Sequence, residues 1–148
     1  MAVLHLEHVG VVVKDLPAAT EFFLALGLEI EGKTSVGGEQ VDRIVGLEGA
    51  QSDVVILQTP GGQAKLELCT FNSPAYAGEI REEPSNAPGI RHVLFAVDDI
   101  HEAVARVKDR GYELVGELVN YSDMYWLCYI RGPEGIIVEL AERVNRQP

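Results

Sequence analysis

The stretch Ile90–Ala103 reads IRHVLFAVDDIHEA and decides the fold, because a strand pattern in it runs directly into a helix pattern. A short apolar run with β-branched and aromatic residues follows His92 and ends at Val97, an Asp-Asp pair comes next, and an apolar helical pattern then begins. The same pattern occurs once before, where Leu6–Ala19 reads LEHVGVVVKDLPAA. This self-similarity indicates an internal duplication, in which one structural unit is built twice.

The two copies align without a gap, and the alignment places similar residues opposite each other. The matched pairs are His8 with His92, Val9 with Val93, Val13 with Val97, Asp15 with Asp99, Ala19 with Ala103, Gly27 with Gly111, and Glu29 with Glu113. The aspartates are placed to cap a helix and the glycines to end it. Two copies are too few for a solenoid, so they predict a domain made of paired modules.

Each copy predicts a β-α-β-β-β module. In the first copy we expect a helix after Asp15, with strands at residues 4–13, 28–34, 54–58 and 65–70. A short helical turn or lid is expected between Val36 and Asp53. In the second copy we expect a helix after Asp99, with further strands at residues 113–118, 124–131 and 136–141. Asp99 followed by Glu102 is a capping-box pattern.

The chain is expected to form a single domain over residues 1–148. Module one covers about residues 4–71, a proline-rich linker covers 72–89, and module two covers about 90–142. The expected fold class is α+β, in which the paired modules form a curved mixed sheet around a pocket. The aromatic loop before the strand at 124–131 is placed to wall that pocket with Tyr121, Met124 or Trp126.

Composition and charge exclude several classes of partner. The formal net charge of −11 argues against a nucleic acid and against an anionic membrane surface. No apolar run reaches the roughly 20 residues needed to span a bilayer, and no signal peptide is visible. Cys69 and Cys128 lie in strand-like runs and are expected to be small core residues, which favours a cytoplasmic location.

Four polar residues interrupt the apolar strands at equivalent places in the two copies. His8 and His92 stand in the opening strands, and Glu67 and Glu139 stand in the last strands. A lone histidine or glutamate in a strand is more often a hydrogen-bonded or solvated residue than a ligand, but here both types recur with the repeat. Desolvating an unpaired carboxylate costs several kcal/mol, which a bound divalent cation offsets. Two imidazoles and two carboxylates suit Fe, Mn, Co, Ni or Zn.

The sequence resembles the vicinal oxygen chelate superfamily, which includes glyoxalase I, methylmalonyl-CoA epimerase, extradiol dioxygenases, and fosfomycin- and bleomycin-resistance proteins. The pieces that carry the resemblance are LEHVGVVVKDL at 6–16, IRHVLFAVDDI at 90–100 and GPEGIIVEL at 132–140. The resemblance extends from about Leu4 to Glu142. It implies paired β-α-β-β-β modules around one divalent metal, which chelates two neighbouring oxygens of a small-molecule substrate. It also implies a homodimer, with the site either within one chain or shared between two.

By this resemblance the metal ligands are His8, Glu67, His92 and Glu139. The set matches bacterial glyoxalase I, whereas the epimerase usually has glutamine where Glu67 stands, and extradiol dioxygenases use two histidines and one glutamate. Bleomycin-binding members generally lack the ligands. One departure concerns the thiol substrate, because glyoxalase I usually has a glutathione-binding arginine where Val12 stands. The family's asparagine after the second ligand has Asn72 as its nearest match, one residue further along.

The reaction expected from these residues is a metal-assisted proton transfer next to a carbonyl, with stabilisation of an enediolate. Glu139 is the first candidate for the general base, by family analogy, and Glu67 the second. This describes a lyase or isomerase of the glyoxalase type. An epimerase of the methylmalonyl-CoA type, an extradiol-type dioxygenase and a small-molecule-binding resistance protein remain as alternatives.

Overall fold

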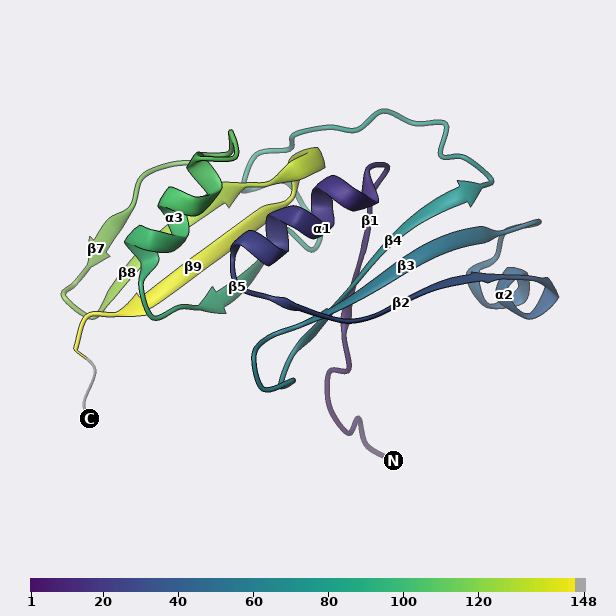
Figure 1. Ribbon diagram of the computed structural model, residues 1–148, viewed down its shortest axis with the longest axis horizontal. Helices are drawn as coiled ribbons and strands as arrows, with labels where there is room; N and C mark the ends of the chain where they lie inside the picture. The colour runs from purple at the N-terminus through teal and green to yellow at the C-terminus, as the bar shows by residue number, and fades with distance from the viewer. Residues whose placement is uncertain (146–148) are drawn as a thin grey trace. The chain divides into compact units, whose positions relative to one another are not determined.

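The computed structural model describes residues 1–145 of the chain, and these form two compact units (Figure 1). The first unit comprises Met1–Glu79 and the second begins at Ile80. Each unit contains one copy of the duplicated pattern, built as a mixed sheet with a helix on it. The predicted α+β class and the repeated β-α-β-β-β order are therefore confirmed, with one added short helix and one added short strand.

The first unit has a four-stranded sheet in the order β1-β4-β3-β2. Its elements are β1 (Val9–Val12), α1 (Leu16–Ala25), β2 (Glu29–Gly37), α2 (Glu39–Val45), β3 (Gln51–Gln58) and β4 (Lys65–Ser73). β1 runs parallel to β4, and the other neighbours are antiparallel. The crossover through α1 is what allows the parallel pair, because antiparallel hairpins alone cannot produce one.

Helix α1 begins where the sequence predicts, because the Asp15 side chain accepts a hydrogen bond from the Ala18 N–H at 3.0 Å. Its apolar side packs on one face of the sheet, and Phe22 and Phe23 are fully buried there. Leu57 and Leu68 are the fully buried residues of the sheet. Since the helix covers only one face, the opposite face of this sheet remains available for polar side chains.

The second unit has a five-stranded sheet in the order β5-β9-β8-β6, with β7 paired to β8. Its elements are β5 (His92–Ala96), α3 (Ile100–Lys108), β6 (Glu113–Leu114), β7 (Val119–Tyr121), β8 (Tyr125–Arg131), a 3-10 turn (Pro133–Gly135) and β9 (Ile137–Arg143). β5 is parallel to β9, which repeats the β1–β4 arrangement of the first unit.

Helix α3 confirms Asp99 as its N-cap, since the Asp99 carboxylate accepts a hydrogen bond from the Glu102 N–H at 2.9 Å, while the Glu102 carboxylate pairs with Arg106. Ile100, Ala103, Val104 and Val107 are its buried residues, as the helical spacing predicts. They lie over a sheet face on which Ile130 and Leu140 are fully buried. The helix again leaves the opposite face of the sheet uncovered by its own unit.

Several element boundaries differ from the prediction, among them the strand expected at 113–118, of which only β6 at Glu113–Leu114 forms. Residues 4–8 do not form a strand, because β4 begins at Lys65 and offers no partner beyond Val9, so Leu4 and Leu6 are exposed. The stretch after Val36 contains the complete short helix α2. Strand β7 lies inside the predicted loop before residue 124, because it is held only by pairing with β8. In the described residues no helix is long and apolar enough to cross a membrane.

Candidate metal centre

His8 and Glu67 lie together on the uncovered face of the first sheet. Glu67 has Gly10 as its parallel partner on β1, and His8 stands two residues before Gly10, so alternation puts both side chains on one face. The His8 Nε2 lies 3.0 Å from the Glu67 Oε2, and the two side chains are 41% and 31% exposed. The strand pairing therefore fixes this pair, and it remains open to a ligand.

His92 and Glu139 repeat this arrangement in the second sheet. Glu139 has Leu94 as its parallel partner, and His92 stands two residues before Leu94. The His92 Nε2 lies 3.1 Å from the Glu139 Oε2, with side chains 37% and 15% exposed. The Tyr129 ring lies 5.0 Å from the His92 ring, between centroids. The register of the duplicated motif thus produces the same histidine–glutamate pair twice.

We call the uncovered sheet face that carries these pairs the site face of each module. Module one has His8, Gly10 and Val12 of β1 on it, with Glu67 and its β3 partner Ile56. In module two the corresponding residues are His92, Leu94 and Ala96 of β5, with Glu139 and its β8 partner Tyr129. The histidine–glutamate pair is therefore the same in both modules, whereas its neighbours differ.

The separation within each pair fits two ligands of one metal ion. Nitrogen and oxygen ligands bind at about 2.0–2.2 Å, so two ligands at right angles lie about 3 Å apart. The observed distances of 3.0 and 3.1 Å match this value, and they also suit a histidine–carboxylate hydrogen bond. The structure brings each predicted histidine to the glutamate of its own module. That the two pairs hold one ion together stays a prediction.

Space is open beside Glu67 but not beside Glu139. A Cβ atom added at Gly10 would meet no atom within 4 Å, and the backbone there is ordinary strand. Leu94 occupies the equivalent place in module two and is 49% exposed. Val12 lies on the site face and is 62% exposed. It stands where glyoxalase I, which the sequence resembles, usually has its glutathione-binding arginine. Module one therefore offers a sterically open approach to its glutamate.

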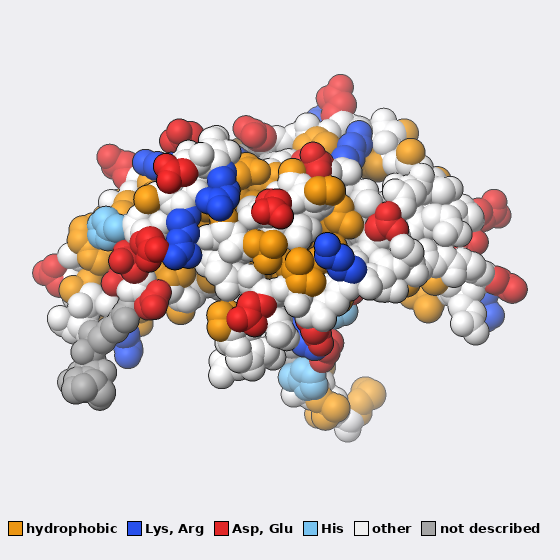
Figure 2. Space-filling view, in the orientation of Figure 1, with side chains coloured by type: hydrophobic (Ala, Val, Ile, Leu, Met, Phe, Trp, Pro, Cys, Tyr) orange, Lys and Arg blue, Asp and Glu red, His pale blue; other side chains and the backbone are white. Residues whose placement is uncertain are grey.

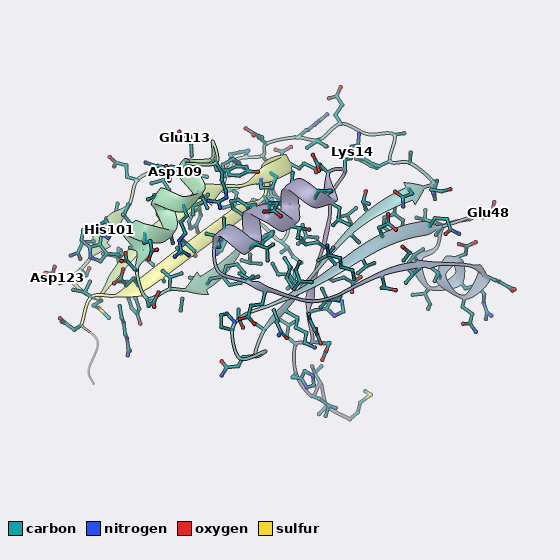
Figure 3. The ribbon with its side chains drawn as sticks, viewed as in Figure 1. Lys14, Glu48, His101, Asp109, Glu113 and Asp123 are labelled. Carbon is teal, nitrogen blue, oxygen red and sulfur yellow. The ribbon has the colours of Figure 1, made fainter. Side chains whose placement is uncertain are left out.

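A second group of possible ligands, which sequence reasoning missed, lies at the start of α3. Asp99, His101 and Glu142 have ligand atoms within 4.8 Å of one another, and Figure 3 labels His101 at this helix end. The two carboxylates accept hydrogen bonds from the N–H groups of Glu102 and Ile100, at 2.9 and 2.8 Å. These contacts give the group a structural role in capping the helix.

Trp126 belongs to this same side of the sheet. Its ring lies 5.2 Å from the His101 ring, and its β9 partner is Glu142. The expectation that Trp126 lines the pocket is therefore wrong, because strand alternation turns it toward the helix. Tyr121 and its partner Tyr125 alternate to the site face instead.

A groove of about 590 Å³ lies beside α1 in the first unit. Leu16, Pro17, Thr20 and Glu21 line it from the helix, and neither His8 nor Glu67 does. On its sheet wall the Asp53 carboxylate accepts hydrogen bonds from Ser35 at 2.6 Å and Asn72 at 3.0 Å, which lower the pKa of Asp53. Asn72 is thus engaged with Asp53, and the groove is separate from the predicted ligands.

The cysteines are buried and free, as predicted. Cys69 and Cys128 are 8% and 3% exposed. Burial raises the pKa of Cys69 and raises that of Cys128 to about 11, because the thiolate would lose its hydration. Both thiols therefore stay protonated at neutral pH and are poor metal ligands.

Two β-α-β-β-β modules, each presenting a histidine–glutamate pair on an uncovered sheet face, define the class of vicinal oxygen chelate folds. The family comparison is specific: residues 5–140 match the model of the Glyoxalase/Bleomycin resistance protein/Dioxygenase superfamily. The chain belongs to this superfamily, which generally contains enzymes and whose members commonly bind a divalent metal.

Solved structures agree with this assignment. A glyoxalase family protein from Bacillus cereus is 41% identical, with 98% of this chain and 97% of that chain covered and a TM-score of 0.93. A fosfomycin resistance protein from Listeria monocytogenes is 18% identical, with 98% and 96% covered and a TM-score of 0.59, which shows the fold alone. No curated protein matches the chain.

Proposed function

We propose that the chain is a divalent-metal-dependent lyase or isomerase of the glyoxalase type, acting on a small molecule with two neighbouring oxygens. The observation that carries this proposal is the repeated histidine–glutamate pair, at 3.0 and 3.1 Å, on equivalent strands of the two modules. A structural histidine would not need a carboxylate at the same register in both copies. The donor set is also that of bacterial glyoxalase I, which the sequence resembles.

His8, Glu67, His92 and Glu139 would hold the ion. When bound, it supplies a Lewis acid that polarises the substrate carbonyl and lowers the free energy of the developing enediolate. The choice among Ni, Zn, Co, Mn and Fe is left to metal analysis, because all accept imidazole and carboxylate ligands.

Glu139 is the proposed general base, and Glu67 is the second candidate. Glu139 Oε2 would take the proton from the carbon next to the carbonyl and return it to the neighbouring carbon. The Glu139 side chain is 15% exposed against 31% for Glu67, so bulk water competes less for its proton. His92 contacts the Glu139 carboxylate, and the Tyr129 ring packs against the His92 ring on the same sheet face.

Metal content tests the site first. We expect about one ion per chain in the purified, reconstituted protein, and loss of most of it in Glu67→Ala and in His92→Ala. Glu142→Ala is the matched control, because Glu142 belongs to the helix-capping group. Unchanged metal content in the first two variants, or loss only in the control, would refute the proposed centre.

Reaction assays then separate the classes. Proton exchange with deuterated solvent is expected for a hemithioacetal or acyl-CoA substrate, with the rate abolished in Glu139→Gln. Oxygen uptake with a catechol and ferrous iron would instead identify a dioxygenase. Chelator-insensitive binding of an antibiotic, without turnover, would identify a resistance protein.

The homodimer that we propose is tested by analytical ultracentrifugation of the full chain.

A further inference from the structure

We infer that Arg143 is the anion-recognition residue of this protein, and that its substrate carries an anionic group at the end remote from its two metal-binding oxygens. The inference rests on the proposed function, because it extends the same site face of module two. It concerns residues of the second unit only.

Arg143 lies on the site face with Glu139. Residues 137, 139, 141 and 143 alternate to this face of β9, since the pairing with β8 runs from Tyr125↔Arg143 to Arg131↔Ile137 without a register shift. Side-chain contacts agree with the alternation. The Arg143 guanidinium lies 6.0 Å from the Tyr125 ring centroid, and Tyr129 contacts His92 on the same face.

The site face of module two changes character along the strands. His92 and Glu139 mark its metal-binding part. An apolar part follows, which is formed by Leu94, Ala96, Leu127, Ala141 and Val119. The far part is aromatic and cationic, with Tyr121, Tyr125 and Arg143. Leu94, Val119 and Tyr121 are 49%, 47% and 61% exposed, so this strip can contact a ligand.

Arg143 is suited to an anion for a chemical reason. The chain has a net charge of −11, in line with the acidic side chains spread over the face of the molecule seen in Figure 2, and strand β9 places the cationic Arg143 on the site face of module two. Arg131 also alternates to this face, but its guanidinium donates to the carbonyls of Glu83 and Gly135, at 2.7 and 3.2 Å. Arg143 is exposed, and a guanidinium over a ring keeps its N–H edge free for a carboxylate.

The duplication provides an internal comparison. Glu139 corresponds to Glu67, and four residues further along the strand Arg143 corresponds to Phe71. A residue needed only for the shared architecture would recur in both modules, as the metal ligands do. Arg143 does not, so the architecture that the two modules share does not require it.

Strand geometry sets the size of the substrate. Four residues at about 3.3 Å per residue separate the Cα atoms of Glu139 and Arg143 by about 13 Å, and both side chains project from the same face of β9. A molecule with two vicinal oxygens, an apolar body of several carbons and a terminal carboxylate or phosphate fits this distance.

The probes are 3-(3,4-dihydroxyphenyl)propanoate, which has vicinal oxygens and a carboxylate, and its uncharged methyl ester. Binding is measured by titration calorimetry with metal-loaded and metal-free protein. We expect the acid to bind about tenfold more tightly than the ester, and Arg143→Gln to remove this preference without changing metal content. Lys108→Gln, on the helix side of the sheet, is the control for loss of one charge and keeps the preference.

The outcomes distinguish the inference from the proposed function. Equal binding of acid and ester, or a preference that survives in Arg143→Gln, would overturn the role of Arg143. Metal-independent binding of both probes, with an acid preference that Arg143→Gln abolishes, would support Arg143 and overturn the metal site. Absence of binding by either probe to the metal-loaded protein would overturn the role of Arg143, whereas the proposed metal centre is refuted separately, by unchanged metal content in Glu67→Ala and His92→Ala.

Discussion

Substitution of Gly10 should change ligand binding at module one without impairing its folding. Gly10 is the strand partner of Glu67, and a Cβ atom added there meets nothing within 4 Å. Its backbone needs no positive φ, so a larger residue can adopt it without strain. The equivalent Leu94 shows that this fold accepts a leucine beside the glutamate.

The expected effects follow from this geometry. Glycine in a strand costs about 0.5–1 kcal/mol relative to alanine, so Gly10→Ala should be more stable by that amount. For a chain of this size the melting temperature should rise by about 1–4 °C. Gly10→Leu should fold equally well and keep its metal. Its side chain fills the open space beside Glu67, so we expect about tenfold weaker binding of the catechol probes.

The assays are calorimetric melting, metal analysis and probe titration on the same preparations. Gly116→Leu is the matched control, because a Cβ atom there also meets nothing within 4 Å and Gly116 lies outside the strands. It should change none of the three readouts. A fall of several degrees in the melting temperature of Gly10→Ala would refute the packing argument. Unchanged probe affinity in Gly10→Leu would show that ligands do not approach Glu67 over Gly10.

Three further predictions concern the second unit. Leu140 is fully buried in β9, so Leu140→Ala should lower the free energy of unfolding by about 2–5 kcal/mol in urea denaturation. Asp99→Ala removes the α3 cap and should cost about 1 kcal/mol by the same measurement, whereas Asp99→Asn should restore most of it. The pKa of Cys128 is raised from 9.0 to about 11, so its contribution to stability is complete below pH 9 and is lost as pH rises to 11. Native protein at pH 8 should leave this thiol unreacted with a disulfide reagent, and Cys128→Ala should reduce the loss of stability between pH 9 and 11.

The sequence predicts best the features that depend on neighbouring residues. The helix starts after Asp15 and Asp99 are confirmed, because a cap needs only a short polar side chain next to an apolar helical pattern. The pairing of His8 with Glu67 is less local, since the residues are far apart in the chain. It was predictable only because the duplication showed the same two residue types again in module two.

The features that were missed depend on pairing between distant segments. β7 exists because Val119–Tyr121 finds β8, and residues 4–8 are irregular because β4 starts too late to pair with them. Trp126 turns toward α3 because its register on β8 pairs it with Glu142 of β9, on the helix side of the sheet. A shift of one residue in a strand reverses every side chain, and no local pattern fixes that register.

The site faces of the two modules share one pair of residues and differ in the residues around it. Histidine and glutamate recur in both, so they serve what both modules need, which in our proposal is binding of the ion. The neighbours do not recur: where module one has Gly10 and Phe71, module two has Leu94 and Arg143. After duplication the ligand pair is constrained in both copies, whereas the surrounding residues are free to diverge. Substrate preference should therefore change when residues are exchanged at these unmatched positions, and metal content should not.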